Sequence, residues 1–398
     1  MTKEQVRKYL RLAILSVVSM IIGSVITILI KDNSVCDTDT KVKRNSNYSE
    51  FEPLYEAYDA IMDDYYKEVS SKKLIDGALD GMMKSLGDKH TSYLNKKEKE
   101  NFDTELSGTY YGVGAQIQLT SENKVKIVKI FDGSPADKSG LKVGDEFVSI
   151  DGKSTEGMNA SDVANKLRSE KASKAKIVVT RDGEELEFTV KKENVTMLSV
   201  SSEMINEDDK NIGYINVSIF GQKTYYQFSE ALTKLESGNM ESLIIDLRGN
   251  SGGYLTTVSN MLELFVDRGK VLYKMQTNDG ITEFKSNSKN EINYKIILLV
   301  DENSASASEI MAAAMKEDCG AVLVGKTTYG KGTVQTTKDL SNNAMIKYTI
   351  EKWLTPSGNN IDGEGIKPDY EVDLGEDYAN NPIRENDAQL QYALDLLK

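Results

Sequence analysis

Buried strands and helices alternate along the second half of the chain, and this alternation restricts its fold more than any other feature. From Asn211 onward, the strand-like runs IGYINVSI, SLIIDLRG, KIILLV and AVLVG are separated by helical stretches near 223–237, 254–264 and 306–317. Continuous apolar strands joined by helices form a mostly parallel sheet with helices packed on its faces. Active groups in such α/β folds gather at the ends of the strands.

Two other patterns precede this half. Residues 48–106 are predicted to be helical, because apolar side chains recur at spacings of three and four from Phe51 and a second helical stretch covers Lys73–Leu86. From about Gly108, short runs rich in β-branched residues alternate with Gly, Asp and Asn, which indicates a small, partly open β barrel. The sequence therefore predicts a multidomain α/β protein.

The N-terminus contains nineteen consecutive residues without a charge, 12–30. As a helix they would span roughly 28 Å, close to the hydrocarbon thickness of a bilayer. A cleaved signal peptide is the alternative, but the run is long for one and no small-residue cleavage site follows; Val35 also disfavours a lipoprotein signal at Cys36. We expect residues 1–31 to be a cytoplasmic tip and a single-pass anchor in the cell membrane, followed by a tether over 32–47. The basic residues before the run would then place the catalytic part outside the cytoplasm.

Composition excludes several classes of site. The net charge is −13, which argues against a protein that coats nucleic acid. The only cysteines, Cys36 and Cys319, and the only histidine, His90, exclude a disulfide framework and a zinc site built from Cys and His clusters. A Ser-His-Asp enzyme would have to use His90 as its base. No nucleophile stands near it in the sequence, so a surface or helix-end histidine is the favoured interpretation.

The segment IIDLRGNSGG, Ile244–Gly253, is a buried strand that runs into a glycine-rich turn. Such a strand end can direct backbone N–H groups at an anion, either a phosphate or a developing oxyanion.

A second segment, Ile296–Lys316, turns from a buried strand into a helix that begins in Ser-Ala-Ser-Ala-Ser. Small residues on both sides of a hydroxyl at a helix start let a substrate backbone approach. The alternative is N-capping, in which Ser304 caps the helix and Ser308 and Glu309 only occupy its first turn. For a single serine, capping is favoured by the local pattern alone.

The loop TTYGKGTVQ, Thr327–Gln335, changes that balance. Lys331 lies between two glycines, where the main chain can pack tightly enough to bury its amine. A serine hydrolase without a usable histidine needs another base, and a lysine serves if burial lowers its pKa. Gln335 could orient that lysine by hydrogen bonding.

Gly112-Val113-Gly114 is compatible with two structures. A glycine loop entering an edge strand can hold a terminal carboxylate while the strand pairs with an extended peptide. An ordinary turn fits these residues equally well.

Taken together, these segments resemble the carboxyl-terminal processing peptidases, or tail-specific proteases, which are serine proteases with a Ser-Lys dyad. The resemblance covers about 350 residues and rests on motifs that occur in the family's order: SLGDKHTSYL, GVGAQI, GSPADKSGLKVGDEFVSIDG, IIDLRGNSGG, SASASEI, GKGTVQ and LTPSGNNIDGEGIKPD. Ser251 and Tyr329 stand where the family usually has Pro and often Phe, and neither change affects a catalytic position.

The resemblance implies specific roles. Ser306 would be the nucleophile, Lys331 the general base and Gln335 the residue that holds the lysine. The N–H groups of Gly252 and Ala307 would form the oxyanion hole.

It also implies domains. Residues 48–106 would be a helical N-terminal region and 107–193 a PDZ domain. The carboxylate-binding loop of that PDZ domain would consist of Tyr111, Gly112, Val113 and Gly114. Residues 194–398 would be an α/β protease core of crotonase/Clp-like type with a C-terminal helix.

The implied function is a membrane-anchored endopeptidase that recognises free apolar C-terminal tails and cleaves through an acyl-enzyme, with no metal or other cofactor. Its partners would be protein or peptide substrates, a second copy or higher homo-oligomer, and an activating or adaptor protein, but not nucleic acid. Two alternatives stay open: a PDZ scaffold that has lost catalysis, and a serine hydrolase acting on small acyl substrates.

Overall fold

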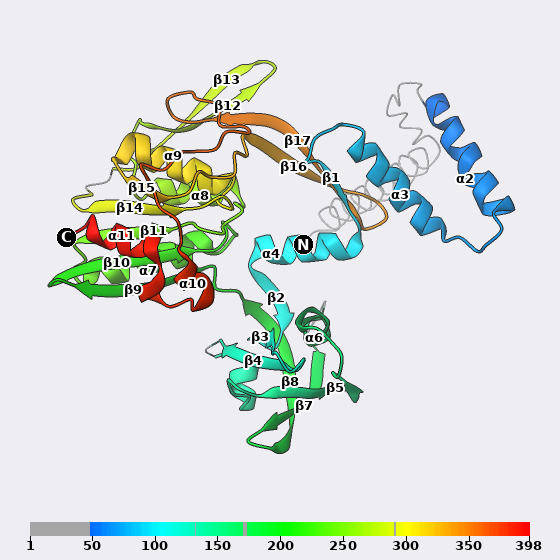
Figure 1. The fold of residues 1–398 in the computed structure, drawn as a ribbon. Coiled ribbons are helices and arrows are strands. Elements are labelled where there is room, and N and C mark those ends of the chain that lie inside the picture. Colours follow the sequence, from blue (N-terminus) through cyan, green and yellow to red (C-terminus); the bar gives the residue numbers. More distant parts are fainter. Residues whose placement is uncertain (1–47, 132, 170–172, 290–291) are drawn as a thin grey trace, which may run out of the picture. The chain divides into compact units, whose positions relative to one another are not determined.

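The computed structural model describes residues 48–131, 133–169, 173–289 and 292–398 (Figure 1). The membrane helix expected at 12–30 and the tether expected at 32–47 lie outside the described residues. Within the described part, no helix combines the length and the apolar character that crossing a membrane requires.

The chain forms two compact units, 1–78 and 79–398. The described part of the first unit is helical, as predicted. It contains a 3-10 turn at Tyr48–Phe51, helix α2 (Glu52–Asp64) and the start of helix α3 (Ser71–Lys84). The Tyr58 hydroxyl donates to Ser71 Oγ at 2.7 Å and so joins the two helices.

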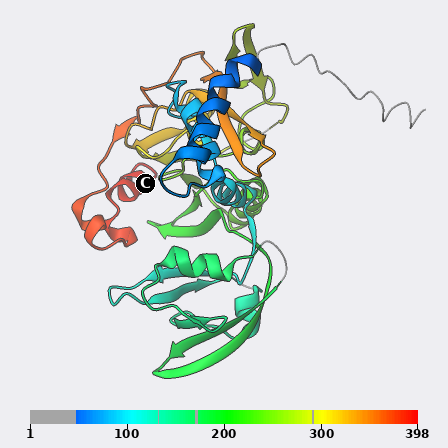
Figure 2. The same ribbon diagram turned by 90° about the vertical axis from the view of Figure 1, so that its right-hand side faces the viewer.

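The second unit includes a seven-stranded sheet in the order β2-β8-β7-β5-β4-β3, with the short β6 paired to β5. Its elements are β2 (Thr109–Gly112), β3 (Ala115–Leu119), β4 (Val125–Ile130), α5 (Pro135–Ser139), β5 (Glu146–Ile150), β6 (Lys153–Ser154), α6 (Ala160–Leu167), β7 (Ser173–Arg181) and β8 (Glu184–Thr196). Figure 2 shows the long green strands curving along this sheet. Its core is small and mainly aliphatic, with Ile127, Ile177 and Val190 fully buried. Strand β3 stands at the edge of the sheet.

The predicted α/β sheet has the order β18-β15-β14-β11-β10-β9. It consists of β9 (Val200–Glu207), β10 (Lys210–Val217), β11 (Ser242–Asp246), β14 (Lys295–Val300), β15 (Val322–Gly325) and β18 (Tyr370–Glu371). All neighbours are parallel except β9 and β10.

Both faces of this sheet are buried, because successive side chains of a strand point to opposite faces. Leu243 and Ile245 belong to the large core that includes residues of α7 (Thr224–Ser237), α8 (Leu255–Leu262) and α9 (Ala307–Cys319). Ile244 belongs to the second core, with Leu390 and Leu394 of α11 (Ala388–Asp395). This explains why the strands are continuously apolar.

A separate antiparallel sheet was not predicted. It has the order β1-β17-β12-β13, with β16 also paired to β17. Its strands are β1 (Ser92–Leu94), β12 (Val271–Thr277), β13 (Gly280–Lys285), β16 (Thr333–Asp339) and β17 (Met345–Leu354). Helix α4 (Lys96–Ser107) follows β1 and begins with a capping box between Asn95 and Glu98. This sheet carries the segment that follows Lys331.

Candidate active site

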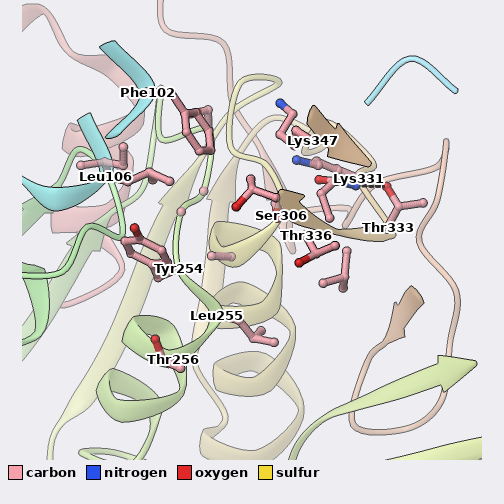
Figure 3. Close-up of a pocket in the computed structure, with 18 of the residues that line it drawn as sticks. Phe102, Leu106, Tyr254, Leu255, Thr256, Ser306, Lys331, Thr333, Thr336 and Lys347 are labelled. Carbon is pink, nitrogen blue, oxygen red and sulfur yellow. Dashed lines mark hydrogen bonds between the residues drawn. The ribbon is translucent and has the colours of Figure 1, made fainter. Parts of the chain in front are cut away.

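A cavity of about 660 Å³ brings together the five residues predicted to perform the chemistry. These are Gly252, Ser306, Ala307, Lys331 and Gln335. Figure 3 shows the side chains of Ser306 and Lys331 in this cavity, with Lys347 beside Lys331. Its apolar lining comes mainly from Phe102, Leu106, Ile219, Tyr254, Leu255, Ile310, Val334 and Trp353.

Ser306 lies immediately before α9 in a strained backbone conformation. Its φ of +56° and ψ of −111° fall in a region that residues other than glycine rarely adopt. The side chains of the other two serines are buried and hydrogen-bonded: Ser304 Oγ donates to Leu247 O and Ser308 Oγ to Asn250 O, each at 2.8 Å. Ser306 is therefore the serine of this segment that lines the cavity.

Lys331 is held by its own main chain. Its N–H donates to Glu309 Oε2 at 2.9 Å, and its carbonyl accepts from Trp353 Nε1 at 2.7 Å. The flanking glycines allow close packing, because a Cβ at position 332 would lie 2.6 Å from the Cβ of Asp362. Burial, aided by the positive charge of Lys347, lowers the pKa of Lys331 to about 8.

Gln335 uses its amide nitrogen to bond hydroxyl groups of the antiparallel sheet. Nε2 donates to Thr333 Oγ1 at 2.9 Å and to Thr349 Oγ1 at 3.2 Å. Among the described residues, no donor bonds its amide oxygen Oε1. That oxygen is therefore available on a side chain that lines the same cavity as Lys331.

The two predicted oxyanion donors differ in their state. Gly252 approaches the nucleophile closely: a Cβ there would lie 2.9 Å from Ser306 Cβ. Its N–H, however, donates to Asn250 Oδ1 at 2.9 Å. The N–H of Ala307 has no acceptor within the described parts of the chain. One predicted donor is thus open and the other is engaged.

Glu309 links the segments that carry Ser306 and Lys331, which the sequence interpretation did not predict. Its side chain is fully buried and its two oxygens accept four hydrogen bonds. Oε2 accepts from the N–H groups of Ser306, at 2.7 Å, and Lys331, at 2.9 Å. Oε1 accepts from Thr328 Oγ1 at 2.6 Å and from Gly330 N at 2.7 Å. The Ser-x-x-Glu spacing could have predicted the bond to Ser306 alone.

His90 does not line the cavity. Its ring packs at 6.3 Å from that of Tyr329, and its Nε2 is buried without a hydrogen-bond partner among the described residues. Burial and the charge of Lys331 lower the pKa of His90.

The segment predicted to be a carboxylate-binding loop is only partly a loop: Tyr111 and Gly112 lie in strand β2, paired with β8, and Val113 and Gly114 link β2 to the edge strand β3. Its carbonyls are used internally: Tyr111 O accepts from Ser169 N, Val113 O from Ala136 N and Gly114 O from Phe131 N. The φ of Gly114 is +79°, and a Cβ there would lie 2.4 Å from Ser134 Cβ, so this position requires glycine.

No group of three or more His, Cys, Asp or Glu side chains in the described residues could hold a metal ion.

Comparison with known families gives three matches. Residues 211–372 match peptidase family S41, residues 127–181 match a PDZ domain, and residues 22–98 match the N-terminal domain of the activating protease CtpB.

Two relatives from Bacillus subtilis (strain 168) are similar over most of the chain. The carboxy-terminal processing protease CtpA is 34% identical over 383 residues, which are 96% of this chain and 81% of the relative. The carboxy-terminal processing protease CtpB is 34% identical over 334 residues, 83% of this chain and 69% of the relative. A solved structure of a candidate S41 protease from Bacteroides fragilis NCTC 9343 shares the fold, with a TM-score of 0.53 and 16% identity over 84% of this chain and 90% of that one.

Proposed function

Because this chain belongs to the carboxy-terminal processing proteases of peptidase family S41, and is a serine-type peptidase with a PDZ domain, we propose that Ser306 is its nucleophile and Lys331 its general base. One observation supports this pairing most strongly. The strained serine and a lysine whose pKa is near 8 line one cavity, and a single carboxylate bonds the N–H groups of both.

The proposed reaction has two halves. The neutral amine of Lys331 takes the proton of Ser306 Oγ as that oxygen bonds the peptide carbonyl carbon. The tetrahedral intermediate then breaks the substrate's C–N bond. The leaving amine of the C-terminal fragment receives the proton from the Lys331 ammonium, and the acyl-enzyme remains. A water molecule attacks the acyl-enzyme by the same route and releases the new C-terminus.

Backbone N–H groups would stabilise the oxyanion. Ala307 is ready to donate, and Gly252 joins it once the oxyanion replaces Asn250 Oδ1 as acceptor. One such donor is typically worth about 3 kcal/mol of transition-state stabilisation. Gln335 would hold the Lys331 amine through its oxygen Oε1.

The proposed substrate is a protein with a free apolar C-terminal tail. The tail would extend the PDZ sheet at β3, an edge strand, and place its carboxylate at the segment Tyr111–Gly114, where β2 ends. The uncharged segment 12–30 would anchor the enzyme in the cell membrane with its catalytic part outside the cytoplasm. We also propose that the enzyme forms a homo-oligomer and that an activating or adaptor protein binds it.

Blocking the substrate's terminal carboxylate should impair cleavage. With an unstructured protein that ends in apolar residues, C-terminal amidation should lower kcat/KM roughly tenfold or more, because a charge-assisted contact with backbone N–H groups is lost. Mass spectrometry of the fragments identifies the cleaved bonds, and an ester of a small acid serves as the control substrate. Equal cleavage of both tails would contradict tail recognition, and hydrolysis of the ester alone would favour a small-acyl hydrolase.

Activity should rise with pH through the pKa of Lys331. Only the neutral amine accepts a proton, so kcat/KM should increase about tenfold per pH unit below pH 8 and level off above it. The measurement is a pH–rate profile from pH 6 to 10 in buffers of constant ionic strength. A rate that does not vary over this range would contradict the role of Lys331.

A further inference from the structure

A chain of hydrogen bonds reaches Gln335 from a loop far away in the sequence. Asp88, in the loop between α3 and β1, accepts from Thr349 Oγ1 at 2.6 Å. Thr349, on β17, in turn accepts from Gln335 Nε2 at 3.2 Å. These hydrogen bonds therefore join the loop that holds Asp88 to a side chain of the catalytic cavity.

Asp88 fixes the donor–acceptor direction of these hydrogen bonds. Burial alone would raise its pKa, but hydrogen bonds from Thr349, Thr91 and the His90 N–H lower it to about 2. An ionised carboxylate only accepts, so the Thr349 hydroxyl must donate to it. The Thr349 oxygen can then only accept from Gln335, which must present its NH₂ group on this side.

We propose that Asp88 is a positioning residue of the catalytic centre, which fixes the orientation of the Gln335 amide so that Oε1, and not the NH₂ group, is presented to the Lys331 amine. This inference rests on the proposed role of Lys331 as general base. A reversed amide would donate to the lone pair of the neutral amine and compete with the proton of Ser306. Asp88 acts through Thr349 and Gln335 and touches no substrate.

The charges around Lys331 determine the direction of the pH effect. Burial and the charge of Lys347 on β17 lower the pKa of Lys331, and the carboxylates of Glu309 on α9 and Asp88 raise it. Removing the charge of Asp88 removes an influence that favours the ammonium form of Lys331. Both this loss and the amide reversal shift the titration of Lys331 in the same direction.

The test uses the full chain in mild detergent and an internally quenched peptide with a free apolar C-terminus. Asp88→Asn keeps the side-chain shape, but its NH₂ group can donate to Thr349, so the direction of the hydrogen bonds to Gln335 can reverse. It should lower kcat roughly 10- to 100-fold, leave KM within about twofold, and move the ascending limb of the pH–rate profile to lower pH. Loss of the Asp88 charge moves this limb by itself. The positioning role is therefore tested by the uncharged variant Thr349→Val, because a turn-forming role of Asp88 alone would leave kcat of that variant unchanged.

Variants of Thr349 test whether Asp88 acts through its hydrogen bond to this hydroxyl. Thr349→Val removes the link to Gln335 on a strand that tolerates valine, and should lower kcat as Asp88→Asn does. Thr349→Ser restores the hydroxyl and should return kcat to within about threefold of the parent. Thr282→Val makes the same change on the exposed strand β13, outside this network, and should keep kcat.

The inference would be overturned if Asp88→Asn and Thr349→Val both kept the kcat and the pH profile of the parent. In the same assay, Ser306→Ala and Lys331→Met should be inactive, which shows that the proposed function itself holds. The same kcat loss in Thr282→Val, outside the network, would also overturn the inference. If Lys331→Met keeps its activity, the proposed function and this inference both fail.

Discussion

Ser306→Ala and Lys331→Met should each lower kcat for peptide cleavage by about 10⁴-fold or more, and the double variant should lose little beyond that. The nucleophile and its base act as one unit, because a hydroxyl that cannot lose its proton and a base without a hydroxyl are equally ineffective. Single-turnover rates of the three variants, measured with a full chain of each, test this non-additivity.

Lys347→Met provides the matched control. It removes a second amine from the same cavity, but not the proposed base. Because the charge of Lys347 lowers the pKa of Lys331, this variant should turn over at high pH with the ascending limb moved to higher pH. The dyad would be excluded if Lys331→Met retained more than about a hundredth of the parent rate. It would also be excluded if the rate loss of the double variant equalled the product of the losses in Ser306→Ala and Lys331→Met.

Glu309→Gln should damage both catalysis and folding. The carboxylate accepts four hydrogen bonds, and an amide has only one oxygen, so two of the four donors would face an NH₂ group. We expect kcat to fall roughly 10²-fold, because the segments that carry Ser306 and Lys331 would be displaced. The free energy of unfolding should fall by about 3 kcal/mol. Denaturant titration and kcat measurements on the same preparation check the two effects together.

The same substitution farther along α9 is its control. Glu317 is an exposed carboxylate that accepts from Ser357 N and Oγ, at 2.7 and 2.9 Å. Glu317→Gln should leave kcat unchanged and the free energy of unfolding within about 0.5 kcal/mol. Parent-like kcat in Glu309→Gln would show that the carboxylate is not needed to align Ser306 with Lys331.

The family and the coarse fold could be predicted from sequence because their signals are local. The strand at the start of Ile244–Gly253 packs against a core on each side of its sheet. Its sequence is therefore continuously apolar and ends in a glycine-rich turn. The resemblance drawn from the motifs is confirmed by the family matches and by relatives at 34% identity, and the mixed α/β fold with a PDZ domain is confirmed as well. The roles of Ser306, Lys331 and Gln335 remain predictions.

The remaining features depend on contacts that the sequence does not display. Glu309 follows a capping pattern, but its partners Thr328 and Gly330 stand about twenty residues away and reach it only through the tertiary fold. Asp88 and Thr349 are farther apart still. The antiparallel sheet was missed because β16 and β17 mix polar and apolar residues and are largely half-buried, so neither periodicity stands out.

The positive φ of Ser306 has an evolutionary consequence. Glycine adopts this conformation without the strain of about 1 kcal/mol that a side chain incurs. If Ser306 is the nucleophile, glycine at this position would give a more stable but inert molecule. Selection for robustness and selection for turnover therefore oppose each other at a single codon, and a lineage released from the need to cleave its substrates would be expected to lose this serine early.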